Sequence, residues 1–118
     1  FAQRQLIEQC MVLGDGEKFV SALIVPNEER VREWATEEGI SLPEDTQELC
    51  HDEQLQARIR EEVEDVNENF EDHEQIKRFA LVPEEFTEDN DLMTPTMKKK
   101  RRNIRERYEA EIERIYGR

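Results

Sequence analysis

The chain has 118 residues, of which 30 are acidic and 17 basic, giving a formal net charge of −13 and a mean hydropathy of −0.95. This length has room for one domain, residues 1–118, and so acidic a surface repels phosphate backbones, which argues against a general nucleic-acid-binding role. No run of about 18 apolar residues and no basic-then-apolar leader is visible, so we expect a cytoplasmic domain without a membrane span or signal peptide. Because the chain begins at Phe1 and runs at once into an apolar pattern, we also expect it to be part of a longer protein.

The basic residues gather at the C-terminal end of the chain. Residues 98–118 hold nine basic and four acidic side chains, whereas residues 1–97 hold eight and 26. Residues 98–102 are five consecutive basic residues that follow a Thr-Pro-Thr segment. This run therefore needs an explanation separate from that of the acidic remainder.

Two apolar runs, residues 7–13 and 19–25, predict a β-hairpin joined through Asp15-Gly16, because Asp-Gly tolerates the positive φ of a tight turn. The second run is apolar at nearly every position. A strand of that composition is expected to lie centrally in its sheet, with both faces covered.

Two helices are predicted after the hairpin. Asn27 is expected to cap a helix over residues 30–38, and Gly39 can provide its left-handed end. The connector that follows has room for one helical turn. A longer helix is predicted over residues 53–70, because apolar residues recur there at steps of three and four: Leu55, Ile59, Val63, Val66 and Phe70.

The last third of the chain predicts a strand over residues 76–83, a loop over residues 84–97 and a terminal helix. The helix has an apolar stripe of Ile104, Tyr108, Ile112 and Ile115. Taken in order, these elements predict a small α+β domain, with a few-stranded sheet that includes a β-hairpin and about three packed helices.

Few residues have the spacing of a known chemical site. Cys10 and Cys50 have no partners at zinc-ligand spacing and are expected to be reduced core thiols, and His51 and His73 are interpreted as surface histidines. The acidic stretch over residues 88–91 lacks the central glycine and closing glutamate of a calcium loop. We therefore predict no metal site.

Three interpretations of residues 98–102 stay open from the residues alone. A localisation signal would need an accessible tail, but the run continues into an amphipathic helix. The residues could instead form a helix face that offsets the acidic remainder. In the third interpretation, Pro95 fixes the loop and aims one lysine at an anion, whose negative charge the ammonium would stabilise.

Three segments resemble one known family: EQCMVLGDGEKFVSALIVPNEE, NENFEDHEQIKRFALVPEEFT and LMTPTMKKKRRNIRERYEAEIERIY. Together they are similar to the C-terminal domain of long-chain fatty acid CoA ligases, members of the adenylate-forming superfamily. The resemblance implies that a fatty acid and Mg-ATP form an acyl-adenylate, which coenzyme A converts to acyl-CoA and AMP. It also implies a mobile domain that swivels on its own large N-terminal domain between the two steps.

The resemblance places a catalytic loop lysine at Lys98, with Lys99 as the alternative, and a substrate-positioning loop at Thr94, Pro95, Thr96 and Met97. Most of the superfamily has glycine where this chain has Met97. The sequence TPTMK, residues 94–98, resembles that of the long-chain branch. An apolar residue is more usual at the position of Lys99.

The family's phosphate loop, adenine-contacting segments and hinge are expected upstream of Phe1. The fragment alone is therefore expected to be inactive and to bind no ATP, Mg²⁺ or coenzyme A, all of which the full-length enzyme would use. The resemblance is compatible with peripheral membrane association of that enzyme. Two alternatives remain: another carboxylate-adenylating enzyme of the superfamily, or a stand-alone interaction module that uses the basic terminal helix.

Overall fold

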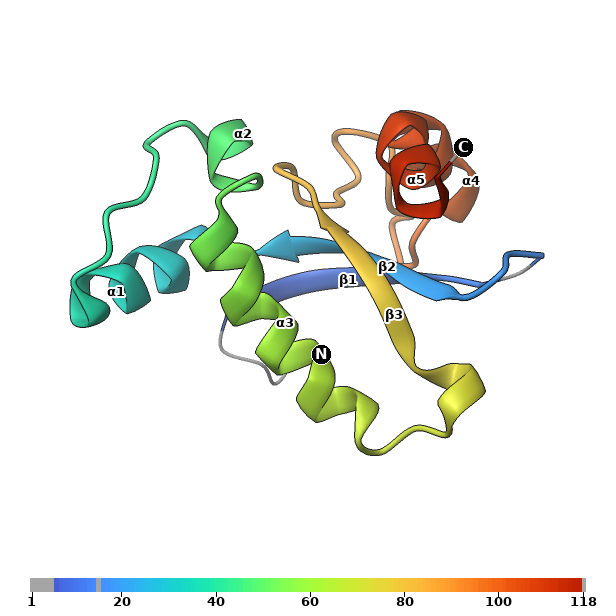
Figure 1. The fold of residues 1–118 in the computed structure, drawn as a ribbon. Helices are drawn as coiled ribbons and strands as arrows, with labels where there is room; N and C mark the ends of the chain where they lie inside the picture. The colour runs from blue at the N-terminus through green and yellow to red at the C-terminus, as the bar shows by residue number, and fades with distance from the viewer. Residues whose placement is uncertain (1–5, 15, 118) are drawn as a thin grey trace.

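The computed structural model describes residues 6–14 and 16–117 and contains a three-stranded mixed sheet (Figure 1). The strands are β1 (Ile7–Leu13), β2 (Val20–Pro26) and β3 (Ile76–Leu81), in the order β1-β2-β3. β1 and β2 pair antiparallel, whereas β2 and β3 pair parallel. The predicted hairpin and the central position of its second strand are therefore confirmed.

Strand β2 is buried on both faces and divides the interior into two hydrophobic cores. Every residue from Ser21 to Pro26 is buried. Ala22 and Ile24 belong to the first core, whereas Leu23 and Val25 belong to the second. This alternation follows from the period of two along a strand, and it explains why the sequence of β2 is apolar at nearly every position.

The first core is covered by α1 (Glu28–Glu38), α2 (Thr46–Leu49) and α3 (Glu53–Asn67). The Asn27 side chain accepts a hydrogen bond from the Arg30 N–H at 3.1 Å, as expected of an N-cap, and Gly39 ends α1 with a φ of 68°. Helix α1 begins two residues before the predicted start. The predicted helical turn of the connector is α2, capped by Asp45.

Helix α3 ends at Asn67, so its predicted extension to Phe70 is wrong. The Asn67 amide accepts from the Ile76 N–H at 2.9 Å and donates to the Ile76 carbonyl at 3.0 Å. These two bonds tie the end of α3 to the start of β3. Phe70 continues the apolar spacing but lies beyond the helix, where its side chain is 40% exposed. The short 3₁₀ turn η1 (Asp72–Glu74) connects the two elements.

The second core is covered by α4 (Arg101–Arg107) and α5 (Glu109–Tyr116), which lie on the other side of the sheet from α3 (Figure 1). The sequence predicted one terminal helix here. The backbone instead bends at Tyr108, whose φ is −110° and ψ 28°. The whole predicted stripe is nevertheless buried: Ile104, Tyr108, Ile112 and Ile115. Within the described residues, no helix combines the length and the apolar character needed to cross a bilayer.

The loop between β1 and β2 is held by the last residues of α5. Of the predicted Asp15-Gly16 turn, Asp15 lies outside the described residues and Gly16 has a φ of 72°. The Tyr116 hydroxyl donates to the Phe19 carbonyl at 2.9 Å and lies 2.7 Å from the Ser21 hydroxyl, which is fully buried. The two aromatic rings, of Phe19 and Tyr116, are 4.7 Å apart.

We expect Tyr116→Phe to lower the free energy of unfolding by about 1–3 kcal/mol, because it leaves the buried Ser21 hydroxyl without this partner. Urea denaturation monitored by circular dichroism measures the change. Ser21→Ala should be less costly, and adding it to Tyr116→Phe should cause little further loss. If the two effects simply add, this hydrogen bond does not couple α5 to the sheet.

Candidate functional site

The candidate site lies in the segment between β3 and α4, which the first strand holds in place. The Gln9 side chain on β1 donates to the Phe86 carbonyl at 3.1 Å and accepts from the Phe86 N–H at 2.7 Å. The Phe86 ring is buried in the second core. A side-chain amide that pairs with both backbone groups of one residue fixes that residue as a neighbouring strand would.

The acidic stretch in this segment forms a polar turn. The Asn90 side-chain oxygen accepts from the Thr87 N–H at 3.0 Å, and its nitrogen donates to the Glu85 carbonyl at 2.7 Å. Asp91 has a positive φ of 61°. Its carboxylate pairs with Lys100 and accepts from the Asn103 side chain at 3.1 Å. These bonds give the stretch a structural role and join Asp91 to the first residues of α4 and to Lys100 before it.

The tip of the segment is a small hairpin that brings all five predicted site residues, 94–98, together. Met93 and Lys99 form an isolated antiparallel bridge. The Thr94 N–H donates to the Lys98 carbonyl at 2.8 Å, and the Met97 N–H donates to the Thr94 carbonyl at 2.9 Å. The Lys98 N–H donates to the Thr94 hydroxyl at 3.1 Å, so the threonine also closes the hairpin through its side chain.

Three residues, Pro95 to Met97, form the loop of this hairpin. Hairpin loops of this length place their last residue in the left-handed conformation. Met97 occupies that position with a φ of 65°, and its side chain is 68% exposed. Glycine adopts this conformation without steric cost. The geometry therefore gives a physical reason why glycine would suit this position.

Lys98 and Lys99 are both exposed at the end of this hairpin. Neither ammonium group makes a hydrogen bond or ion pair with any residue that the structure describes. In an extended segment, successive side chains point to opposite sides. The two lysine side chains therefore cannot both face the same ligand or domain surface.

Most other basic side chains of the C-terminal end have partners within the chain. Lys100 pairs with Asp91, and Arg101 donates to the Val12 carbonyl. Further along, four arginines pair with carboxylates: Arg102 with Glu106, Arg105 with Glu17, Arg107 with Glu84 and Arg114 with Glu111. The basic residues of the described C-terminal end thus fall into two groups. Lys98 and Lys99 have no partner among the described residues, whereas the others contact groups within the chain.

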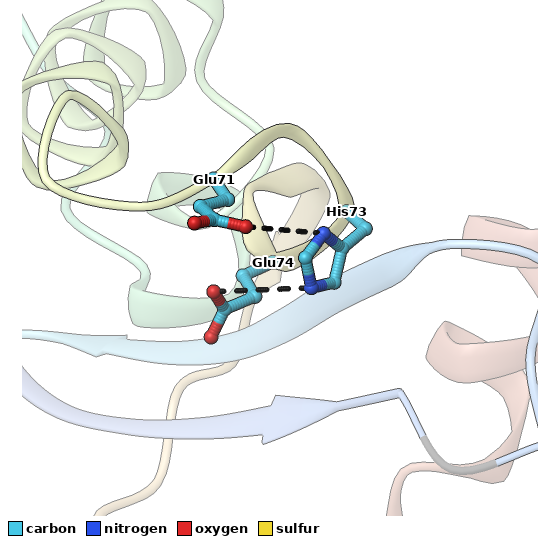
Figure 2. Close-up of side chains that lie close together, drawn as sticks. All are labelled: Glu71, His73 and Glu74. Atoms are coloured by element: carbon cyan, nitrogen blue, oxygen red, sulfur yellow. Dashed lines mark ion pairs between the residues drawn. The ribbon is translucent and has the colours of Figure 1, made fainter.

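Both predicted surface histidines are exposed, as expected. His73 lies on η1 between two carboxylates, with its Nδ1 3.9 Å from Glu71 and its Nε2 3.9 Å from Glu74 (Figure 2). The ligand atoms of the three side chains lie within 4.8 Å of one another. Because each carboxylate faces a different ring nitrogen, we interpret the cluster as exposed surface charge.

The two cysteines are free thiols, with Cys50 buried and Cys10 partly buried against the first core. Burial raises the pKa of each thiol to about 11. Thiols with such pKa values carry little thiolate at neutral pH and react slowly. Cys50 therefore lies in the core, as expected, and Cys10 lies at the edge of the core.

Sequence reasoning missed the residues that hold the hairpin, because their partners are distant in the chain. Gln9 lies in an amphipathic strand and meets Phe86, 77 residues away. Asn103 donates to Asp91 across 12 residues. The available signals are weak: a polar Gln between apolar strand residues, and an Asp-Lys pair around a turn. Both patterns are also common on protein surfaces that have no functional role.

Comparison with known proteins identifies the family. Residues 1–118 match the AMP-binding enzyme C-terminal domain family. Long-chain-fatty-acid–CoA ligase FadD15 of Mycobacterium tuberculosis is 35% identical over 112 residues, which cover 95% of this chain and 19% of the ligase. Long-chain-fatty-acid–CoA ligase 1 of Cavia porcellus is 30% identical over 120 residues, which cover 99% of this chain and 17% of the ligase. The chain thus spans less than a fifth of these relatives.

The fold is also similar to parts of solved structures. The adenylation domain of a carboxylate reductase from Mycobacterium chelonae has a TM-score of 0.70 at 20% identity, over 96% of this chain and 16% of that one. The A-PCP didomain of a carboxylic acid reductase from Segniliparus rugosus has the same TM-score at 17% identity, over 98% of this chain and 14% of that one. At these identities the likeness concerns the fold. The chain belongs to the AMP-binding enzyme C-terminal domain family.

Proposed function

We propose that this chain is the mobile C-terminal domain of a longer AMP-forming long-chain fatty acid CoA ligase, and that Lys98 is its adenylation lysine. The supporting observation is that Lys98 is exposed at a closed hairpin and has no partner among the described residues, whereas Lys100 and Arg101 are engaged. Lys99 is also exposed and unpaired, and the family resemblance selects Lys98 between the two. A cation without an internal partner can meet an anion that another domain presents.

The proposed reaction has two steps in the full-length, cytoplasmic enzyme. A fatty acid carboxylate attacks the α-phosphorus of Mg-ATP, forming an acyl-adenylate and releasing pyrophosphate. The thiol of coenzyme A, losing its proton, then attacks the acyl carbonyl, and AMP leaves as the thioester forms. Residues 94–98 contain no carboxylate, so magnesium would enter with ATP and be held by other groups.

In this proposal, Lys98 acts in the first step. Negative charge shifts onto the α-phosphate oxygens as the carboxylate attacks, and a preorganised ammonium stabilises that charge where it develops. Thr94 restricts the hairpin because its hydroxyl accepts a hydrogen bond from the Lys98 N–H. Pro95 restricts it because the proline ring fixes φ. The domain would dock on the large N-terminal domain for this step and swivel away for the second. The same enzyme could associate peripherally with the membrane that supplies its fatty acid.

A second candidate is adenylation of another carboxylic acid, because carboxylate reductase adenylation domains share this fold. The two are distinguished by assaying the full-length protein with acids of increasing chain length. The interaction-module alternative relied on a free basic helix face. It loses support because the arginines of α4 pair within the chain, as described above.

The loop that carries the lysine is also strained. A non-glycine residue in the left-handed region costs about 1 kcal/mol or more. Met97 is in this region, and because its side chain is largely exposed, packing offsets little of the cost. We infer that this strain persists because the bonds of Thr94 and Lys98 hold the hairpin closed.

In the full-length protein, we expect Lys98→Ala to slow acyl-adenylate formation by about 10²–10³-fold, because charge stabilisation in the transition state is lost. ATP–pyrophosphate exchange measures this step. Thioester formation from supplied acyl-adenylate should be nearly unchanged.

Lys99→Ala is the matched control, since it removes the neighbouring exposed lysine, whose side chain is expected to point away from that of Lys98. It should change either step by no more than a few-fold. Greater damage from Lys99→Ala would transfer the catalytic role to that residue. Equal loss of both steps in Lys98→Ala would contradict the proposed role in adenylation.

Met97→Gly should raise the free energy of unfolding by up to about 1 kcal/mol, because it relieves the positive-φ strain at some cost in backbone entropy. Chemical denaturation measures the difference. Met97→Ala retains a Cβ atom and should be close to neutral. If glycine and alanine behave alike, the hairpin does not hold this residue in the left-handed region.

A further inference from the structure

A groove runs along the edge of β3 that faces away from β2. It consists of two adjoining hollows of about 330 Å³ and about 390 Å³, which share Cys50, His51, Leu81 and Glu111. The segment from α2 to α3 lines one side, and α4 and α5 line the other. None of the hairpin residues 94–98 lines it, so it is separate from the proposed catalytic loop.

The groove follows the strand edge rather than one face of the sheet. Four consecutive residues, from Arg78 to Leu81, line the first hollow. Successive side chains of a strand point to opposite faces, so a hollow on one face would be lined by alternate residues. Contact with all four places the hollow beside the backbone of β3.

The backbone of β3 presents unpaired groups to this groove. The Val82 N–H donates to the Ile24 carbonyl on β2 at 2.9 Å. Backbone groups alternate between the two sides of a strand, so Ala80 also faces β2, while the N–H and C=O groups of Phe79 and Leu81 face outward. Within the described residues no further strand pairs with β3. These four backbone groups therefore have no partner strand within the described residues, and Leu81, although only 5% exposed, reaches the surface where the two hollows meet.

At the start of β3, a side chain already occupies the corresponding position. The Asn67 amide exchanges two hydrogen bonds with the backbone of Ile76, which is the pattern of a paired strand residue. This contact closes the edge at Ile76 and marks one end of the groove. The open stretch begins beyond it.

The groove is basic although the chain has a net charge of −13. Its lining contains four arginines and two glutamates: Arg60, Arg78, Arg107, Arg114, Glu84 and Glu111. Arg107 and Arg114 pair with the glutamates. Arg60 lies 5.0 Å from the centre of the Phe79 ring, and Arg78 donates to the Ile115 carbonyl at 3.1 Å. Neither has a carboxylate partner among the described residues, which leaves two net positive charges for a ligand.

We propose that this groove binds an extended, acidic segment of a partner protein, which joins the sheet as a fourth strand beside β3. The open groups of Phe79 and Leu81 supply the backbone hydrogen bonds, and Arg60 and Arg78 attract carboxylates of the added strand. A second copy of this chain is disfavoured at the same edge, because pairing β3 with itself would bring together the exposed Lys77 and Arg78 of both copies.

The test uses the purified chain and a fluorescent peptide that alternates valine and glutamate, with an alternating valine–lysine peptide for comparison. Anisotropy should show salt-sensitive binding of the acidic peptide alone. Arg60→Glu should weaken it by about tenfold or more, since an attraction becomes a repulsion. Arg102→Glu makes the same charge change outside the groove and should have less than about a threefold effect.

Amide hydrogen exchange monitored by NMR tests the strand-addition geometry. Without peptide, the Phe79 and Leu81 amides should exchange faster than those of Arg78 and Ala80, and peptide should protect them. A peptide with N-methylated valines should not bind. Absence of binding at low salt, equal effects of Arg60→Glu and Arg102→Glu, or protection elsewhere would overturn the proposal. Concentration-dependent protection of Phe79 and Leu81 without peptide would also overturn it, because the occupant would then be a second copy.

Discussion

The two-sided burial of β2 is the constraint on which the rest of the architecture depends. A strand with both faces covered needs a layer of structure on each side. The parallel pairing of β2 with β3 requires a crossover, and α1 to α3 form it over the first core. The chain then has to cover the second face, which it does with the segment after β3 and with α4 and α5. The candidate hairpin emerges from this second layer, so its position follows from the burial of β2.

The charge distribution has a local explanation within this architecture. An acidic domain repels its own surface, and cations placed near the carboxylates reduce that repulsion. The arginines of α4 and α5 contact Glu17, Glu84 and Glu111, which lie on three different parts of the chain. The exposed pair of Arg107 with Glu84 contributes about 1 kcal/mol or less. Within residues 98–102, Lys98 and Lys99 are the cations that have no partner among the described residues.

Local patterns predicted the elements well, whereas contacts between distant residues decided the details. The Asn27 cap and the apolar run of β2 depend on neighbouring residues, and both were predicted correctly. The end of α3 at Asn67 depends on Ile76 in the next strand, which the spacing of apolar residues cannot reveal. The bend at Tyr108 could not be predicted from the apolar spacing either, because the stripe stays buried on both sides of the bend. For the site, the sequence indicated a loop restricted by proline and a lysine that follows it. The roles of Gln9 and Asp91 in holding that loop could be recognised only from the fold.

The hairpin combines a firm base with a strained tip, and this contrast bears on its proposed role. The base is fixed by Gln9 and by the contacts of Asp91 with α4. Strain at Met97 would favour opening of the loop, but the bonds between Thr94 and the adjoining residues oppose it. A lysine on a flexible loop would lose conformational entropy when it binds its anion. A lysine on this hairpin has already lost much of its backbone entropy on folding. Under the proposed function, the free energy of docking would then stabilise charge instead of ordering the loop.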